Sequence, residues 1–224
     1  MSFGDKKLSE IAVSVPGSTS LLRKYDLDFC CGGSDTLANA AAEKGLNLAE
    51  IETRLTELQN SKAENPEEYW VNATYPEIID HILVRYHQRH REQLQELIVL
   101  ADRVESVHGD REDCPMGVAA ELRNVYEDLS NHMMKEEHVL FPMIKAGNYM
   151  MAQMPIRMME MEHAEHGEHL DVLKSLTNNM TPPADACNTW RALYSGIQEF
   201  ADDLMMHIHR ENNILFPRVI AKNH

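Results

Sequence analysis

Residues 132–142 of the chain read HMMKEEHVLFP, and residues 207–217 read HIHRENNILFP. The two segments share the pattern H-x-x-x-E-x-x-[V/I]-L-F-P, so each places a histidine and a glutamate four residues apart. On a helix, residues with this spacing lie about 40° apart on one face, one turn from each other. An imidazole and a carboxylate arranged in this way can both bind at one metal site.

The repeat extends upstream of both segments. Residues 87–97 read HQRHREQLQEL and residues 163–173 read HAEHGEHLDVL, and both fit H-x-x-H-x-E-x-L-x-x-L. The first histidine of each segment precedes the next H-x-x-x-E motif by 45 residues in one copy and 44 in the other. The repeated unit is therefore predicted to be a helical hairpin. Two such hairpins predict an all-α, antiparallel four-helix bundle with four histidines and two glutamates directed inward.

A metal centre explains this inward set better than ordinary core histidines do, because a buried carboxylate without a cation or donor costs several kcal/mol. Imidazole and carboxylate donors suit iron, manganese or zinc and argue against an iron–sulfur cluster within the bundle. Six protein ligands around two ions leave positions for an oxo bridge, water or a small diatomic molecule. Spacing does not choose between His87 and His90, or between His163 and His166, as ligands.

The composition limits the location and the partners of the protein. Its 224 residues have a net charge of −15, which argues against nucleic acid or an anionic membrane surface, because both require basic patches. No apolar run approaches the ~20 residues of a membrane span, and the N-terminus does not resemble a signal peptide. Four cysteines in a chain of this length do not make a disulfide framework. We therefore expect a cytoplasmic protein.

The chain divides into three predicted segments: a small helical module at residues 1–60, a linker at 61–73 and the bundle at 74–224. Helices are predicted in the module at 8–15, 18–25, 35–44 and 48–60, and in the bundle at 74–108, 116–146, 154–177 and 184–220. Pro142 and Pro217 each follow the motif glutamate by six residues, so both helices are expected to bend there.

Cys30 and Cys31 lie in the segment DFCCGG at residues 28–33, which its two glycines predict to be a turn. Adjacent cysteines match neither the redox nor the zinc form of C-x-x-C. A role in redox chemistry, metal relay or partner contact is open, and so is a role as small buried hydrophobes.

Two other groups of residues are predicted to have no role in the centre. Spacing gives five histidines no inward partner, so they are expected at the surface: His108, His138, His169, His209 and His224. The fourteen methionines are expected to fill the core.

The order of lone histidine, H-x-x-x-E, lone histidine and H-x-x-x-E resembles the hemerythrin-like family of non-haem di-iron four-helix bundles. Hemerythrins that carry oxygen have H-x-x-x-H on the third helix, where this chain has Gly167 four residues after His163. Their last motif is H-x-x-x-x-D, where this chain has His207 and Glu211. These departures favour a symmetric site of four histidines and two glutamates over an oxygen carrier.

The same departures, the DFCCGG turn and the segment LSEIA at residues 8–12 resemble the iron–sulfur cluster repair di-iron proteins of the YtfE/ScdA type. The resemblance covers nearly the whole chain, including an ScdA-like N-terminal module. It implies a cytoplasmic stress-response protein that restores clusters damaged by nitric oxide or peroxide. It also implies two iron ions, bridged by the two glutamates, with His90 and His166 as outer neighbours and with these ligands: His87, His132, Glu136, His163, His207 and Glu211.

Three functions compete. The leading hypothesis is repair of damaged iron–sulfur proteins by supply of iron, with Cys30 or Cys31 as candidates for transfer or docking. The second is an enzyme that reduces nitric oxide at the di-iron centre, which would need an external electron donor because no flavin, haem or nucleotide module is visible. The third is reversible binding of oxygen or nitric oxide. The sequence leaves open whether nitric oxide is turned over, whether the chain forms a homodimer, and which clients it serves.

Overall fold

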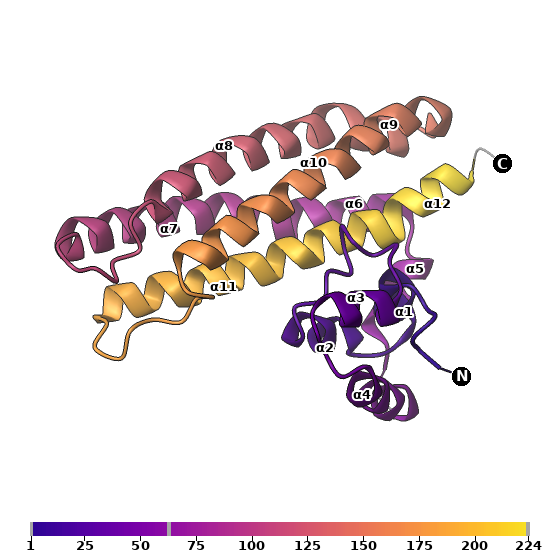
Figure 1. The fold of residues 1–224 in the computed structure, drawn as a ribbon. Coiled ribbons are helices and arrows are strands. Elements are labelled where there is room, and N and C mark those ends of the chain that lie inside the picture. Colours follow the sequence, from indigo (N-terminus) through magenta and orange to yellow (C-terminus); the bar gives the residue numbers. More distant parts are fainter. Residues whose placement is uncertain (1, 62–63, 223–224) are drawn as a thin grey trace. The chain divides into compact units, whose positions relative to one another are not determined.

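The computed structural model describes residues 2–61 and 64–222, and the regular elements among them are helices (Figure 1). The chain divides into two compact units. We call residues 79–205 the bundle unit, and we call the residues up to Ile78 together with those from Met206 onward the terminal unit. The borders fall inside helices α6 (Tyr75–Ile82) and α11 (Asn188–His209), so both helices contribute residues to each unit.

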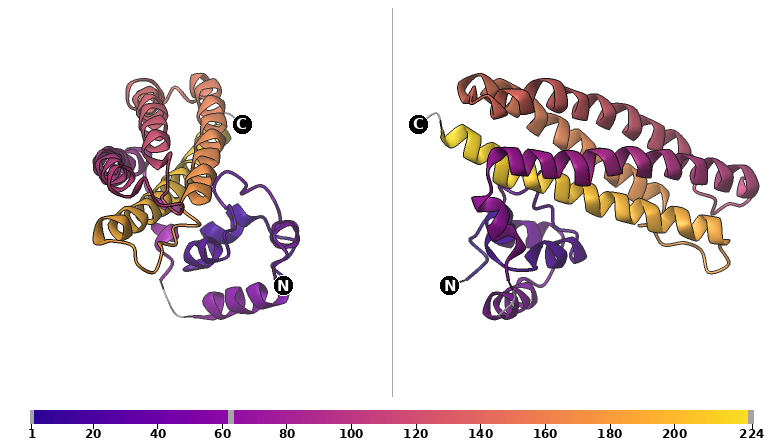
Figure 2. Two further views of the ribbon diagram at one scale, coloured as in Figure 1. Left: turned by 60° about the vertical axis from the view of Figure 1, so that its left-hand side comes forward. Right: turned by 180° about the vertical axis from the view of Figure 1, so that it is seen from behind.

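The bundle unit is built from long helices that lie side by side (Figures 1 and 2). They are α7 (Gln88–His108), α8 (Val118–Lys135), α10 (Tyr149–Leu176) and residues 188–205 of α11. α8 packs against both α7 and α10. α11 lies beside α7, where a Cβ added to Gly196 would come within 2.7 Å of the Cδ2 atom of Leu97. The predicted all-α bundle is confirmed, and none of the helices among the described residues is long and apolar enough to cross a membrane.

The start of α8 shows how local sequence and packing fix a helix end together. Gly117 precedes the helix with a φ of 99°, a left-handed conformation that glycine adopts without the strain of a side chain. Glu105 of α7 then accepts hydrogen bonds from the N–H groups of Gly117 and Ala119. The first turn of a helix has N–H groups without intrahelical partners, so this carboxylate both caps α8 and attaches it to α7.

The terminal unit contains the predicted helices of the N-terminal module within one or two residues of their predicted ends. They are α1 (Leu8–Ser14), α2 (Ser18–Lys24), α3 (Leu37–Glu43) and α4 (Leu48–Asn60). A further helix, α5 (Pro66–Asn72), lies in the segment predicted as a linker, of which residues 62 and 63 are outside the described residues. The chain from Met206 onward belongs to the same unit and ends in α12 (Phe216–Ala221), and α1 packs against the turn that precedes α12.

Among the described residues, three π-helical turns interrupt the long helices, and each contains one residue of the predicted ligand set. They are η1 (Leu83–His87), η2 (Glu136–Leu140) and η3 (Arg210–Leu215). A π turn closes its hydrogen bond over five residues instead of four, and such turns are frequent at functional sites. The sequence analysis did not predict them.

The prolines account for two of these turns. After η2 the N–H of Phe141 bonds back to the carbonyl of Glu136, and α9 (Phe141–Lys145) continues through Pro142. After η3 the N–H of Phe216 bonds in the same way to the carbonyl of Glu211, and Pro217 follows. Proline has no N–H and crowds the carbonyl four residues before it, so a widened turn directly ahead of it relieves that crowding. η1 has no proline.

Two expectations about individual side chains were wrong. His209 is completely buried instead of lying at the surface, because it packs inside the terminal unit. Several methionines do not fill the core: on α10 the exposed fraction is 67% for Met150, 65% for Met151 and 71% for Met154. These residues lie along one solvent-facing side of α10, whereas its inward side carries residues such as Ile156.

Candidate metal centre

The bundle unit brings together four of the predicted ligands, all at most 1% exposed. The Oε2 atom of Glu136 lies 3.3 Å from Nε2 of His87 and 3.5 Å from Nε2 of His132. The Nε2 atoms of His132 and His163 are 3.1 Å apart, and donor atoms of His132, Glu136 and His163 all lie within 4.8 Å of one another. One carboxylate oxygen of Glu136 therefore lies close to two histidines.

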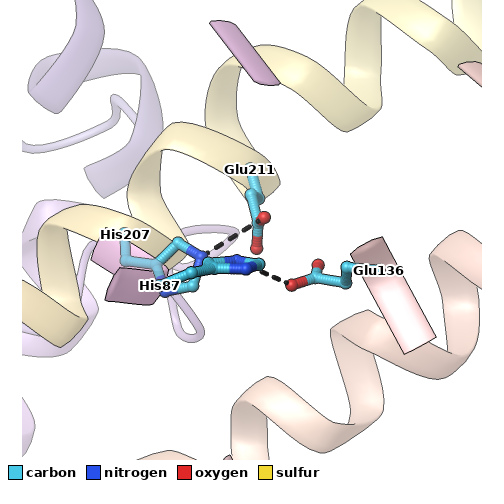
Figure 3. Close-up of side chains that lie close together, drawn as sticks. All are labelled: His87, Glu136, His207 and Glu211. Atoms are coloured by element: carbon cyan, nitrogen blue, oxygen red, sulfur yellow. Dashed lines mark ion pairs between the residues drawn. The ribbon is translucent and has the colours of Figure 1, made fainter. Parts of the chain in front are cut away.

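The terminal unit holds the other copy of the motif. His207, near the end of α11, and Glu211, in η3, are at most 1% exposed, and Nε2 of His207 lies 3.4 Å from Oε1 of Glu211. Figure 3 shows this pair and the His87–Glu136 pair, each joined by a dashed line. The distance within the motif is almost the same in both copies, 3.5 Å for His132 and Glu136 and 3.4 Å here.

Outer carboxylates orient two of the histidines. Nδ1 of His87 lies 2.8 Å from Glu137, and Nδ1 of His132 lies 2.9 Å from Glu162, so each ring donates on that side and leaves Nε2 toward Glu136. The hydrogen bond from His87 lowers the pKa of Glu137 to about 2, and that from His132 lowers the pKa of Glu162 to about 2. Both carboxylates are thus charged at neutral pH.

Cations stabilise the same two carboxylates from the solvent side. Arg91 donates to Glu137 over 2.7 Å, and Lys135 donates to Glu162 over 2.5 Å. The sequence analysis missed both glutamates, because each stands next to a predicted ligand and has the appearance of an ordinary surface acid. The only signal was their position directly beside the motif residues Glu136 and His163.

The alternative histidines lie in the core of the bundle unit. Nδ1 of His90 is 3.3 Å from Gln93, and its ring stacks on Tyr86 and meets the ring of Phe200 edge-on. The ring of His166 lies edge-on to His132, with centroids 4.9 Å apart. Both histidines have ring neighbours, and their outer position relative to a metal stays a prediction.

The donors of the bundle unit fit a first-row transition metal. Two ligands that each lie about 2.1 Å from one ion are roughly 3.0–3.4 Å apart in octahedral to tetrahedral geometry. The separations of 3.3 and 3.5 Å from Glu136 to its two histidines are close to that range. Imidazole nitrogen with carboxylate oxygen is the donor chemistry of iron, manganese and zinc sites.

The dicysteine turn lies in the terminal unit. The Oδ1 atom of Asp28 accepts hydrogen bonds of 2.9 Å from the N–H groups of both Cys30 and Cys31, and its Oδ2 accepts one of 2.8 Å from Gly32. Cys30 is buried and Cys31 is partly exposed, with 3.9 Å between the sulfur atoms. The hydrogen bond with Cys31, together with burial, raises the pKa of Cys30 well above 9, so its thiol is protonated at neutral pH.

A buried polar network surrounds the residues beside Glu211. Arg210 forms an ion pair with Glu67 of α5 and lies over the ring of Trp70, 4.8 Å from its centroid. Nε2 of His209 lies 3.5 Å from the same glutamate. Burial disfavours the charge on Glu67, but its hydrogen bonds with His209 and Arg210 outweigh that effect and lower its pKa below 4.5. The sequence analysis did not find this network.

Buried histidines and glutamates in a helical bundle are typical of metal-binding helical bundles. Comparison with known families shows which family of such bundles this is. Residues 78–219 match the hemerythrin HHE cation binding domain, and the chain belongs to this family. Residues 4–59 match ScdA_N, a domain described as of unknown function.

Related proteins match the chain over nearly its whole length. It is 67% identical, over 98% of this chain and 99% of the relative, to a "probable iron-sulfur cluster repair protein" of Haemophilus influenzae. It is 55% identical to the "iron-sulfur cluster repair protein YtfE" of Citrobacter koseri, over 99% of each chain, and 54% identical to that of Musicola paradisiaca, over 98% of each. The resemblance noted in the sequence is confirmed.

Proposed function

We propose that the protein is a cytoplasmic di-iron protein that repairs iron–sulfur clusters damaged by nitrosative or oxidative stress, by supplying iron. The observation that carries the proposal is the position of Glu136, between His87 and His132 and within reach of His163. The family supports metal binding, and relatives that match the full length are named for cluster repair.

The second motif copy supplies the remaining ligands of the proposed centre. We assign His87 and His207 to one ion and His132 and His163 to the other, with Glu136 and Glu211 as bridges. The Nε2 atoms of His132 and His163 are 3.1 Å apart, which supports their assignment to the same ion. His87 contacts Glu136 through its own Nε2 atom and is therefore assigned to the other ion. Glu137 and Glu162 keep Nε2 of their histidines available as the donor atom.

The donor set supports release of iron as well as its binding. Thiolate and sulfide are softer ligands than imidazole and carboxylate and bind iron in clusters. An iron pair held only by nitrogen and oxygen donors can therefore pass to the cysteines of a client. Bound iron would supply the metal for rebuilding, and the buried histidines and outer carboxylates of this chain would hold it until then.

Transfer of iron to a client tests the proposal. Protein purified under native conditions should contain about two iron ions per chain, because a carboxylate that bridges must bind two ions. Mixed without oxygen with an apo-cluster protein and a sulfide source, it should restore the client's cluster absorption while losing its own iron. The His132→Ala variant should fail to do so, and the control variant His138→Ala, at an exposed position in η2, should perform as the native protein.

Two results would overturn the proposal. A native protein that contains zinc or no metal would remove the di-iron centre. A native protein that retains its iron beside the client, but consumes nitric oxide with an electron donor over many turnovers, would favour the nitric oxide reductase function instead.

A further inference from the structure

The dicysteine turn is a second place where metal-binding side chains converge. Donor atoms of Asp28, Cys30 and Cys31 all lie within 4.8 Å of one another. The two sulfur atoms are 3.9 Å apart, and the sulfur of Cys30 is 3.2 Å from Oδ1 of Asp28. All three residues belong to the terminal unit.

These separations match the edges of a tetrahedral metal site. With metal–sulfur bonds of about 2.3 Å, two thiolates on one ion lie about 3.8 Å apart, and a thiolate and a carboxylate oxygen lie about 3.5 Å apart. The sulfur atoms of Cys30 and Cys31 already have this spacing within about 0.1 Å, and the oxygen of Asp28 would move by a few tenths of an ångström. The turn has the geometry for chelation.

The backbone of the turn is fixed from two sides. Asp28 accepts the N–H groups of both cysteines, and Asn212 and Asn213 donate side-chain hydrogen bonds of 3.1 and 2.8 Å to the carbonyls of Cys30 and Phe29. The turn also requires glycine, because a Cβ at Gly33 would lie 2.4 Å from the carbonyl oxygen of Phe29. A site that is held in place before its ligand arrives loses little conformational entropy on binding.

Exposure leaves room for an outside ligand. Cys30 is 6% exposed, Cys31 is partly exposed and Asp28 is exposed, so an ion on these three residues would be open to solvent on one side. A closed structural zinc site uses four protein ligands, whereas three protein ligands leave one position open. That position is where a thiolate of another protein can attach.

We propose that Cys30, Cys31 and Asp28 form a second metal site, which binds one thiophilic divalent ion such as iron(II) and keeps one coordination position open. The inference rests on the proposed function, in which the site would hold iron on its way to a client. Binding forms two metal–sulfur bonds and releases the two thiol protons to water, and the metal and the sulfur keep their oxidation states. Affinity should therefore rise with pH.

Asn212 and Asn213 give the site a connection to the main centre. They directly follow Glu211 in η3, and their side chains hold the carbonyls of the dicysteine turn. If η3 moves when Glu211 gains or loses its ion, the side chains of Asn212 and Asn213 would therefore move the backbone of the dicysteine turn with it. Both cysteine-bearing and ligand-bearing segments belong to the terminal unit.

Cobalt(II) is a direct probe, because its bonds to thiolate give an intense charge-transfer absorption that bonds to nitrogen or oxygen do not. Cobalt(II) is added without oxygen to the full-length protein whose bundle has been loaded with iron. We expect one additional cobalt per chain and a thiolate band that is stronger at about pH 8 than at about pH 6. The double variant C30S/C31S should lose both the additional cobalt and the band while keeping the bundle iron.

Cys187→Ser is the matched control, because Cys187 is also partly exposed and its sulfur lies 3.2 Å from a histidine, His108. A band that persists in C30S/C31S, or one that disappears in Cys187→Ser, overturns the site. Iron transfer to an apo-cluster protein is measured separately on the native chain. Failure of that transfer would overturn the proposed function without affecting the cobalt result, so the two failures are distinguishable.

Discussion

The turn around Glu136 and the turn around Glu211 are copies of one sequence pattern set in different surroundings. Both begin with H-x-x-x-E, both form a π turn, and in both a phenylalanine N–H bonds back to the carbonyl of the glutamate before a proline follows. The distance from histidine to glutamate is 3.5 Å in one copy and 3.4 Å in the other. The parts that would bind metal are thus nearly the same.

The flanking residues differ in what they contact. After Glu136, Glu137 accepts hydrogen bonds from His87 and Arg91 inside the bundle unit. After Glu211, Asn212 and Asn213 hold the dicysteine turn instead. The comparison teaches that a duplicated ligand motif can keep its chemistry while its neighbours take on separate tasks: the first copy supports the histidines, and the second attaches the N-terminal module.

The largest expected effect is the loss of metal when either glutamate is removed. Glu136→Ala and Glu211→Ala should each leave fewer than half of about two iron ions per chain, because a bridge serves both ions. Single alanine variants of His87, His132, His163 and His207 should each retain more iron than either glutamate variant. Metal analysis of natively purified proteins measures this, and full iron in both glutamate variants would refute the bridging assignment.

Glutamine variants of the same two glutamates separate the effect of side-chain size from the effect of charge. Glu136→Gln and Glu211→Gln keep the size of the side chain and remove its charge, so they should lose iron nearly as severely as the alanine variants. If only one of the two copies loses iron in this series, the two motifs are not equivalent ligands, and the symmetry inferred from the repeat is wrong.

A second prediction concerns the basic residue before each glutamate. Arg210→Ala removes the buried arginine partner of Glu67 and leaves this carboxylate beside His209, so it should cost about 3–5 kcal/mol in free energy of unfolding. Lys135 occupies the equivalent position in the first copy, but its side chain is 49% exposed, so Lys135→Ala should cost less than about 1 kcal/mol. Urea unfolding of both variants measures the contrast.

A double variant that removes both charges of the Arg210–Glu67 ion pair is the control for this difference in stability. The double variant Arg210→Met with Glu67→Leu removes both charges and should recover much of the loss, because the cost comes mainly from an unpaired buried charge. Equal costs for the two single variants would show that burial of the pair in the terminal unit does not distinguish the two copies.

Much of the bundle could be predicted because the sequence pattern that specifies its helices is periodic and involves residues close together in the chain. The repeat gave the order of the helices, and the four-residue spacing of His132 and Glu136 placed both on one face. The choice between His87 and His90 could not be made in this way. Three residues span nearly one turn, so both lie near the inward face, and the family resemblance decided the assignment.

The remaining features depend on contacts between distant parts of the chain. His209 was expected at the surface because its polar partners Glu67 and Asn213 were not recognisable as such from spacing. The outer glutamates could not be separated from the many surface acids of a chain with net charge −15. The turn η1 has no proline beside it, so its widened hydrogen bond from Gln88 to Leu83 could not be predicted from the sequence.

The third prediction tests the outer carboxylates of the first copy. Glu137→Gln and Glu162→Gln should each lower metal affinity by about 10–100-fold, because the amide orients the histidine less strongly than a carboxylate does. Glu165→Gln, at an exposed position on α10, is the matched control and should leave affinity unchanged. Competition with a chelator measures the affinities, and unchanged values in all three variants would remove the role of Glu137 and Glu162.

The fourth prediction concerns Gly167, which stands four residues after His163 just as Arg91 stands four after His87. In the described part of the chain, no atom outside the local helix backbone lies within 4 Å of where its Cβ would be, so Gly167→Ala should stabilise α10 by about 0.5–1 kcal/mol. Gly196→Ala is the contrasting variant: its Cβ would meet Leu97 at 2.7 Å and should cancel or reverse the gain. A gain of equal size in both, measured by urea unfolding, would contradict the close approach of α7 and α11.

The smallest expected effect is on stability and concerns His169. The first copy of the repeat has Gln93 at the position that His169 occupies in the second. Burial disfavours the charged imidazole, but hydrogen bonds to Glu121 and Asp128 outweigh it and raise the pKa of His169 above 6.5. Because the folded state binds this proton more tightly, the ion pairs stabilise the protein fully below pH 6.5 and lose their effect as pH rises through the raised pKa. His169→Gln should therefore cost less than about 1 kcal/mol at low pH and almost nothing at high pH. Urea unfolding of native and variant protein at about pH 5.5 and about pH 9 measures the difference, and a constant cost across this range would show that the proton on His169 does not contribute to stability.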